Sequence, residues 1–168
     1  MGFLLGWIAF CFAGCVVRMS LLDSASSPDT MRRLLQALCF VWLGLVVGIS
    51  FLEAPVKFTA PSLIRPVGLD VGRHVFTALN RVELVLAVLV VGSWWVGRPG
   101  SWVTGSLALV GGVLLLQTAW LLPTLKAQAA TIIDGGSVPG PNYVHVAYGL
   151  LEGAKVLALA AAGWWCGG

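Results

Sequence analysis

Apolar residues dominate four long stretches of the chain, and they run continuously instead of alternating with polar residues. The stretches cover about residues 34–54, 74–97, 101–123 and 143–166. Each can form a helix that crosses a hydrocarbon layer of about 30 Å, which takes about 20 apolar residues. Continuous runs favour helices over the strands of a membrane barrel, where lipid-facing and lumen-facing residues alternate. The pattern predicts an all-α, integral membrane, up-and-down four-helix bundle.

Composition supports this class. Hydrophobic residues make up 58% of the 168 residues and charged residues only 10%, whereas soluble domains have about 25% charged residues. We expect one transmembrane domain, residues 31–168, because short loops join the stretches. The net charge is +3 and the basic residues are scattered. No basic patch therefore favours nucleic-acid binding.

The first 30 residues form a separate segment in this interpretation. Residues 2–17 are apolar but short for a membrane span, and the polar run 24–29 follows them. Three alternatives stay open for residues 1–30: a short or tilted extra helix, a signal-like leader, or translated sequence upstream of a true start at Met31.

Basic residues near the helix ends give a prediction of orientation. Arginines lie on one side of the first long helix and in the second loop, namely Arg18, Arg32, Arg33 and Arg98. Because basic residues gather in cytoplasmic loops, this side is predicted to face the cytoplasm. The loop over residues 56–72 contains Pro61 and Pro66 and follows Pro55, so we expect an ordered cap or short interfacial helix there, with no further span.

Polar side chains concentrate at the opposite membrane face. In an up-and-down bundle this face receives the end of the first helix, the start of the second, the end of the third and the start of the fourth. The candidate ligand-binding residues there are Glu53, His74, Asn80, Arg81, Gln117, Tyr148, Glu152 and Lys155. They predict a polar pocket that opens outward between the helices.

The fourth helix carries the clearest polar stripe. At 100° per residue, His145, Tyr148, Glu152 and Lys155 fall within an arc of about 80°. At 1.5 Å per residue, Lys155 lies about 15 Å deeper than His145. An unpaired charge at that depth costs several kcal/mol. We therefore predict that Glu152 and Lys155 point into the bundle and pair with Arg81, Asn80 or Gln117, either at a ligand site or as a purely structural ion-pair network.

Short motifs resemble a known group of proteins. They are W-L-G at 42–44, A-P-V-K-F at 54–58 and the run G-L-D-V-G-R-H-V-F at 68–76. This pattern is similar to small bacterial four-helix membrane proteins classed as a domain of unknown function. Those proteins are grouped with eukaryotic proteins of the TMEM type, and their layout resembles that of small anthrone-oxygenase-like membrane proteins. The resemblance implies a four-helix membrane fold over residues 34–166 and a bacterial cytoplasmic (inner) membrane location, and it supplies no catalytic residues.

Three functions follow as hypotheses. The first is binding of a small amphipathic molecule, a lipid headgroup or an ion in the outward pocket. The second is a small membrane enzyme or cofactor protein in which His74 and His145 hold a haem or metal ion, or act as acid and base on a substrate such as a quinone. The third is an accessory subunit whose charged stripe faces a partner membrane subunit or a second copy of the chain. Membrane lipids are expected partners in all three.

Overall fold

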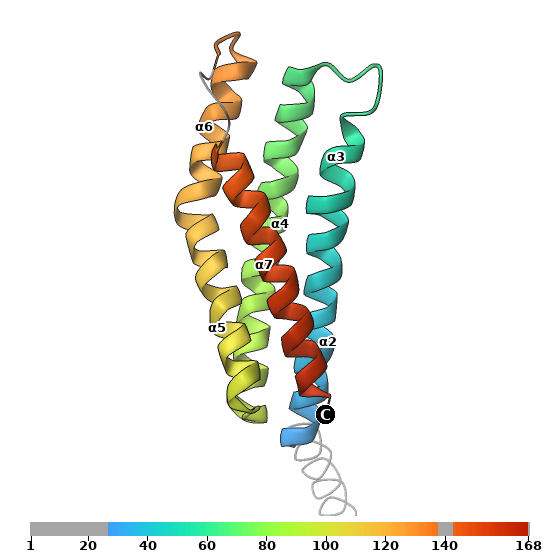
Figure 1. Ribbon diagram of the computed structural model, residues 1–168, viewed down its shortest axis with the longest axis vertical. Helices are drawn as coiled ribbons and strands as arrows, with labels where there is room; N and C mark the ends of the chain where they lie inside the picture. Colours follow the sequence, from blue (N-terminus) through green and yellow to red (C-terminus); the bar gives the residue numbers. More distant parts are fainter. Residues whose placement is uncertain (1–26, 138–142, 168) are drawn as a thin grey trace, which may run out of the picture.

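The computed structural model describes residues 27–137 and 143–167, which form helices packed side by side, with no strand among these residues (Figure 1). Four rods can be followed along the chain. They are α2 (Pro28–Val46), the π-helical segment η1 (Val47–Glu53) and α3 (Ala54–Lys57); α4 (Arg65–Gly97); α5 (Ser101–Leu116), the π-helical segment η2 (Gln117–Leu121) and α6 (Leu122–Ile133); and α7 (Tyr143–Cys166). All four are long and apolar enough to cross a membrane. The predicted all-α four-helix membrane bundle is confirmed.

Successive rods run in opposite directions and bury a narrow apolar core. The rod of α2 packs against α4 and α7, α5 packs against α7, and α4 packs against α6. Small residues permit close approach at one of these contacts, because a Cβ at Gly163 of α7 would lie 3.0 Å from the Phe40 ring of α2. The core side chains include Leu35, Cys39, Trp42, Val46, Leu86, Val90, Val110 and Leu159.

The first rod begins earlier than its apolar stretch predicts. Ser27 caps α2 by accepting a hydrogen bond from the Thr30 backbone N–H at 3.3 Å, and Pro28 occupies the first turn. A proline costs no hydrogen bond there, because the first helical N–H groups have no intrahelical partner. The proposed segment boundary after residue 30 therefore falls inside the first turn of α2. The three alternatives for the N-terminal segment concern residues 1–26, which lie outside the described residues.

The connection between the first two rods is shorter than predicted. The helix continues through Pro55 to Lys57, and α4 starts at Arg65 with Pro66 in its first turn. Only residues 58–64, which contain Pro61, remain outside helices. The expectation that this connection does not cross the membrane is confirmed. The expected bounds of 56–72 were wrong, because Pro55 lies inside the first rod and Pro66 in the first turn of α4, where a proline is tolerated.

That distortion is π-helical at both internal prolines. Pro55 follows η1 by two residues, and Pro123 follows η2 by two residues. A proline lacks the N–H that would reach the carbonyl four residues earlier, and its ring clashes with that carbonyl. A π-helical turn pairs groups five residues apart, so the clash is relieved while the helix continues. As a result the third rod extends to Ile133, well past its predicted end at residue 123.

Aromatic residues indicate where one membrane interface lies. Four exposed tryptophans lie where α4 ends, α5 begins and α7 ends, namely Trp95, Trp102, Trp164 and Trp165, as in the aromatic belts of membrane proteins. A fifth, Trp120, lies in η2. Counting about 20 residues back from Gly97 places the other interface near Thr77. The helix α4 and the third rod each have 33 residues, which is about 50 Å. Their ends distant from the tryptophans therefore extend past the hydrocarbon layer.

Candidate functional site

Two charged residues of α7 lie entirely inside the bundle. Glu152 and Lys155 have 0% exposure, which confirms that they point inward. The Lys155 Nζ atom lies 2.5 Å from Glu83 Oε1 of α4 and 3.0 Å from Glu152 Oε1. It also donates a hydrogen bond to Gln117 Oε1 of η2 at 2.9 Å. Glu83, Gln117, Glu152 and Lys155 thus surround one ammonium group.

Two further hydrogen bonds complete this arrangement. Gln117 Nε2 donates to Glu152 Oε1 at 2.9 Å, and Trp42 Nε1 of α2 donates to Glu83 Oε1 at 2.9 Å. All four rods therefore contribute a side chain to one hydrogen-bonded group. We call Trp42, Glu83, Gln117, Glu152 and Lys155 the polar core cluster.

The polar core cluster has more acidic than basic groups. If every group is ionised, Glu83 and Glu152 contribute two negative charges and Lys155 one positive charge. The second oxygen of each carboxylate, Oε2, is buried and has no hydrogen-bond partner among the described residues. Withdrawing a charge from water costs several kcal/mol unless it is paired. One more positive charge would make the cluster neutral.

Glu83 lies on the core side of α4 because of its spacing from the buried apolar residues of that helix. The buried positions Leu79, Glu83, Leu86 and Val90 follow one another at intervals of four, three and four residues, which keeps them on one helix face. Arg81 lies about 200° around the helix from Glu83 and is exposed. The predicted pairing of Arg81 with Glu152 or Lys155 was therefore wrong, and Glu83 takes that place.

The exposed position of Arg81 is compatible with the membrane register. Four residues separate Arg81 from Thr77, which is about 6 Å along the helix. A long arginine side chain covers that distance and places its guanidinium at the interface. Asn80, the preceding residue, is buried and donates a hydrogen bond to Thr118 Oγ1 of η2 at 2.8 Å. Asn80 thus joins α4 to η2 beside the polar core cluster without contacting Lys155.

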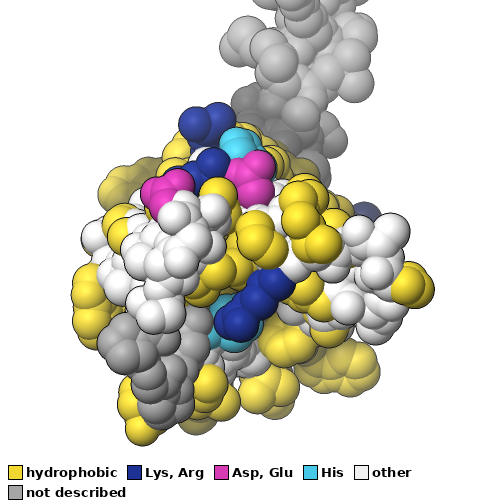
Figure 2. All heavy atoms as spheres, turned by 90° about the horizontal axis from the view of Figure 1, so that it is seen from above, with side chains coloured by type: hydrophobic (Ala, Val, Ile, Leu, Met, Phe, Trp, Pro, Cys, Tyr) yellow, Lys and Arg dark blue, Asp and Glu magenta, His cyan; other side chains and the backbone are white. Residues whose placement is uncertain are grey.

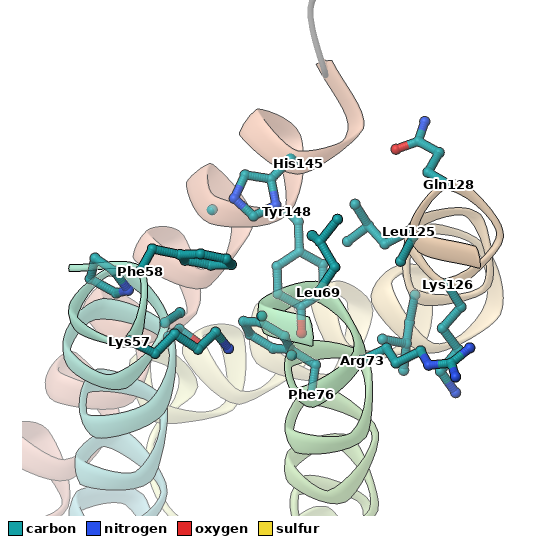
Figure 3. A pocket seen from close by; sticks show the side chains of 18 of the residues that line it. Lys57, Phe58, Leu69, Arg73, Phe76, Leu125, Lys126, Gln128, His145 and Tyr148 are labelled. Carbon is teal, nitrogen blue, oxygen red and sulfur yellow. The ribbon is translucent and has the colours of Figure 1, made fainter. Parts of the chain in front are cut away.

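A cavity of about 380 Å³ lies directly against the cluster, enclosed by α3, α4, α6 and α7 (Figure 3). Glu152 belongs to both, since its side chain also lines the cavity. Tyr148 lies one turn before Glu152, and its ring meets the Phe76 ring edge-on with centroids 5.5 Å apart. Apolar side chains such as Leu69 and Leu125 line much of the remaining wall. The cavity therefore joins an apolar wall to a buried carboxylate.

Lys57 contributes a positive charge on the α3 side of the cavity. Its ammonium lies 3.3 Å from Glu53, and it stands 5.6 and 5.8 Å from the ring centroids of Phe58 and Phe76. A Cβ at Gly72 of α4 would come within 3.2 Å of Lys57 Nζ. The glycine therefore leaves room for this ammonium. The predicted site residue Glu53 does not line the cavity, but it pairs with Lys57, which does.

Two more basic side chains, Arg73 and Lys126, come from α4 and α6 on the side away from Lys57 (Figure 3). Arg73 is paired with Asp70 one turn earlier at 2.6 Å. Lys126 has no ion pair or hydrogen bond within the described ranges of the chain. Seen from above, charged and histidine side chains gather at this end of the bundle, with basic side chains in a central hollow (Figure 2).

Two other polar atoms in the cavity wall are, like Glu152 Oε2, buried and without a hydrogen-bond partner among the described residues. They are Ser50 Oγ and Gln128 Oε1. Buried polar atoms without partners are rare in folded proteins. The cavity thus offers a bound molecule polar contacts from η1, α6 and α7 in addition to its apolar wall.

The two histidines do not meet at this cavity. His145 lines it, whereas His74 is 74% exposed and its Nδ1 lies 2.8 Å from the Asp70 backbone oxygen. No group of three or more metal-ligating side chains occurs among the described residues. The predicted joint haem or metal site of His74 and His145 is therefore not assembled in this cavity.

The residues that sequence reasoning missed are Trp42 and Glu83 in the cluster and Lys57, Arg73 and Lys126 around the cavity.

Comparisons of the chain with protein-family models, with curated proteins and with solved structures found no match. The resemblance to four-helix proteins of unknown function stays a prediction that rests on motifs within residues 34–166.

Proposed function

We propose that this integral membrane protein binds a small amphipathic molecule with an anionic headgroup, of the carboxylate or phosphate class found in lipids. The observation that carries the proposal is the cavity of about 380 Å³ with an apolar wall and a basic surround. Sites for small molecules have volumes of about 300–1,000 Å³ and combine apolar walls with a few polar groups. This cavity has both properties.

The charges around the cavity favour an anion. Lys57, Arg73 and Lys126 contribute three positive charges, and Glu152 contributes one negative charge at the cluster. Lys57 and Arg73 already have carboxylate partners, so Lys126 is the side chain best able to pair with an incoming headgroup. A hydrogen bond between an ammonium and a carboxylate or phosphate is about twice as strong as a neutral one.

The depth of the cavity suits a molecule that partitions into lipid. In the register set by the tryptophans, Arg73 lies about 6 Å above the interface at Thr77. Lys126 lies roughly as far above Leu121, where about 20 residues counted from Ser101 reach the same interface. The basic side chains thus stand at the level of lipid headgroups. We propose further that this end faces outward, as the arginines at the other end predict.

The two other functions predicted from the sequence have weaker support. A haem, metal or quinone enzyme built on His74 and His145 would need these side chains at one site, and only His145 lines the cavity. An accessory subunit was expected to present the charged stripe of α7 to a partner. Glu152 and Lys155 are fully buried, so this stripe offers no surface for such a partner.

Filling the cavity tests the proposal. A Cβ at Gly149 meets nothing within 4 Å and Gly149 lines the cavity, whereas Gly153 is equally open but does not line it. Gly149→Leu should reduce binding of dodecyl phosphate at least about tenfold, or about 1.4 kcal/mol. Gly153→Leu is the matched control and should bind like the wild type. Native mass spectrometry of the detergent-purified protein gives the bound fraction.

The headgroup preference is measured with the same assay. Lys126→Gln should weaken binding of dodecyl phosphate and leave binding of the uncharged dodecanol unchanged. Equal binding of dodecyl phosphate by the wild type and the Gly149 variant would overturn the cavity as the binding site. An equal loss for both ligands in the Lys126 variant would show that Lys126 does not recognise the anion.

A further inference from the structure

We propose that Glu83 and Glu152 together hold one exchangeable proton, which makes the polar core cluster a proton-binding site that is reached from the cavity. Each carboxylate gives its Oε1 atom to Lys155, at 2.5 Å for Glu83 and 3.0 Å for Glu152. Each keeps its Oε2 atom without a partner among the described residues, although both side chains are fully buried. The cluster therefore has two vacant acceptor atoms and a single cation.

The charge balance favours a proton. Two carboxylates and one ammonium sum to one negative charge in the outer part of a membrane span, where an uncompensated charge is strongly disfavoured. Addition of one proton to either Oε2 gives a neutral cluster and leaves every hydrogen bond to Lys155, Gln117 and Trp42 intact. Like-charged carboxylates that share a site commonly share a proton for the same reason.

No other charged side chain among the described residues replaces that proton. Within residues 27–137 and 143–167, the groups that face the two carboxylates are Lys155 and Tyr148 of α7, Gln117 of η2 and Trp42 of α2, and of these only Lys155 carries a charge. The basic side chains around the cavity have other environments: Lys57 pairs with Glu53 of its own rod, and Arg73 pairs with Asp70. Lys126 and Arg81 make no ion pair in the described part of the chain.

The cavity gives the proton a route. Glu152 lines the cavity, whereas Glu83 does not. A proton that enters from the headgroup side therefore reaches Glu152 first, and Glu83 lies behind Lys155. This arrangement needs no bound amphiphile. If the proposed function also holds, a molecule in the cavity covers Glu152 and its binding becomes linked to the protonation of the cluster.

Infrared spectroscopy of the full-length protein in lipid nanodiscs tests the proton site. At neutral pH the wild type should show the C=O stretching band of a protonated carboxylic acid, and the band should shift in D₂O. Glu83→Gln and Glu152→Gln should each abolish the band, because a neutral amide leaves one carboxylate to pair with Lys155. The control Glu53→Gln, which alters the ion pair with Lys57, should leave the band unchanged.

Removal of the ammonium should have the opposite effect. Lys155→Gln leaves two carboxylates without a cation, so both should be protonated and the band should become about twice as strong. A wild type without the band overturns the proposal, and this measurement needs no variant to fold. A band that survives in both glutamine variants also overturns it, because the proton then resides elsewhere.

Two further measurements separate this site from alternatives. Sodium chloride should not remove the band when it replaces choline chloride at equal concentration. Loss of the band in sodium would identify a metal-cation site and overturn the proton site. Gly149→Leu should slow deuterium exchange of the band, whereas Gly153→Leu should not. Unchanged exchange in the Gly149 variant would refute the cavity route, and a failure of amphiphile binding alone would leave the band in place.

Discussion

Replacing Lys155 with methionine should destabilise the bundle more than any other single loss of charge that we consider. Within the described part of the chain, its ammonium is the only basic group in contact with Glu83 and Glu152, and all three side chains have 0% exposure. Methionine preserves most of the volume of the side chain but removes three hydrogen-bond donors. The two carboxylates then face each other across an apolar side chain.

The loss of unfolding free energy can be estimated from the response that costs the least free energy, which is protonation of one more carboxylate. The ordinary pKa of a glutamate is about 4.3, so protonation at pH 7 costs about 2.7 × 1.36, or about 3.7 kcal/mol. This agrees with the 3–5 kcal/mol typical of breaking a buried ion pair. For a chain of this size, about 4 kcal/mol lowers Tm by roughly 8–16 °C.

Thermal unfolding in detergent, followed by far-UV circular dichroism, measures this loss. Lys57→Met removes a lysine whose partner Glu53 is 35% exposed and should cost less than about 1 kcal/mol. The folded Lys155 variant binds an extra proton that the unfolded chain releases above pH 4.3, so its deficit should shrink by about 1.4 kcal/mol per pH unit as the pH falls toward that value.

Neutralising the whole cluster should reverse the loss. The triple variant Glu83→Gln, Lys155→Met, Glu152→Gln has no buried charge and should recover most of the stability of the wild type, because a buried ion pair is often no more stabilising than neutral residues of similar volume. A Lys155→Met variant with an unchanged Tm would refute this reasoning. So would a triple variant that is no more stable than the single one.

Two other predictions concern packing and orientation. Gly68→Ala should destabilise the protein, because a Cβ there would lie 2.5 Å from the Phe58 ring. A Cβ at Gly44 has nothing within 4 Å, so Gly44→Ala should stabilise its helix by up to about 1 kcal/mol. Equal Tm values for the two variants would contradict the close contact at Gly68. A cysteine placed at Lys126 should react with a membrane-impermeant maleimide in intact cells and one placed at Arg98 should not, and the reverse labelling would invert the proposed orientation.

Much of the fold could be predicted from the sequence, because length and apolarity alone determine which segments can cross a membrane. The four apolar stretches became four rods, and the burial of Glu152 and Lys155 followed from the cost of a charge in hydrocarbon. The rod ends were less predictable. Residues such as Arg65 and Lys126 lie in helices that extend past the hydrocarbon, where polar side chains are tolerated and hydropathy no longer marks the helix.

The partners within the site were predicted only in part. Gln117 was expected beside Lys155 and lies there, but Arg81 was also expected there and Glu83 was not. The error came from following the polar residues of α4 instead of its buried apolar face, on which Leu79 and Leu86 bracket Glu83. The contribution of Trp42 depends on how closely α2 and α4 approach, and no local pattern in either helix contains that information.

The π-helical segment η2 also alters which side of its rod faces inward. At about 100° per residue in an uninterrupted α-helix, Leu122 and Ala129 would lie roughly 100–120° around the axis from Val110. All three are nevertheless buried. The wider turn between them has the effect of one inserted residue, which rotates α6 about the rod axis by about 100° relative to an uninterrupted helix. The residues of α6 that line the cavity therefore face the bundle interior. Shortening η2 by one residue would keep the rod apolar and helical, yet it would turn Gln128 and its neighbours away from the cavity.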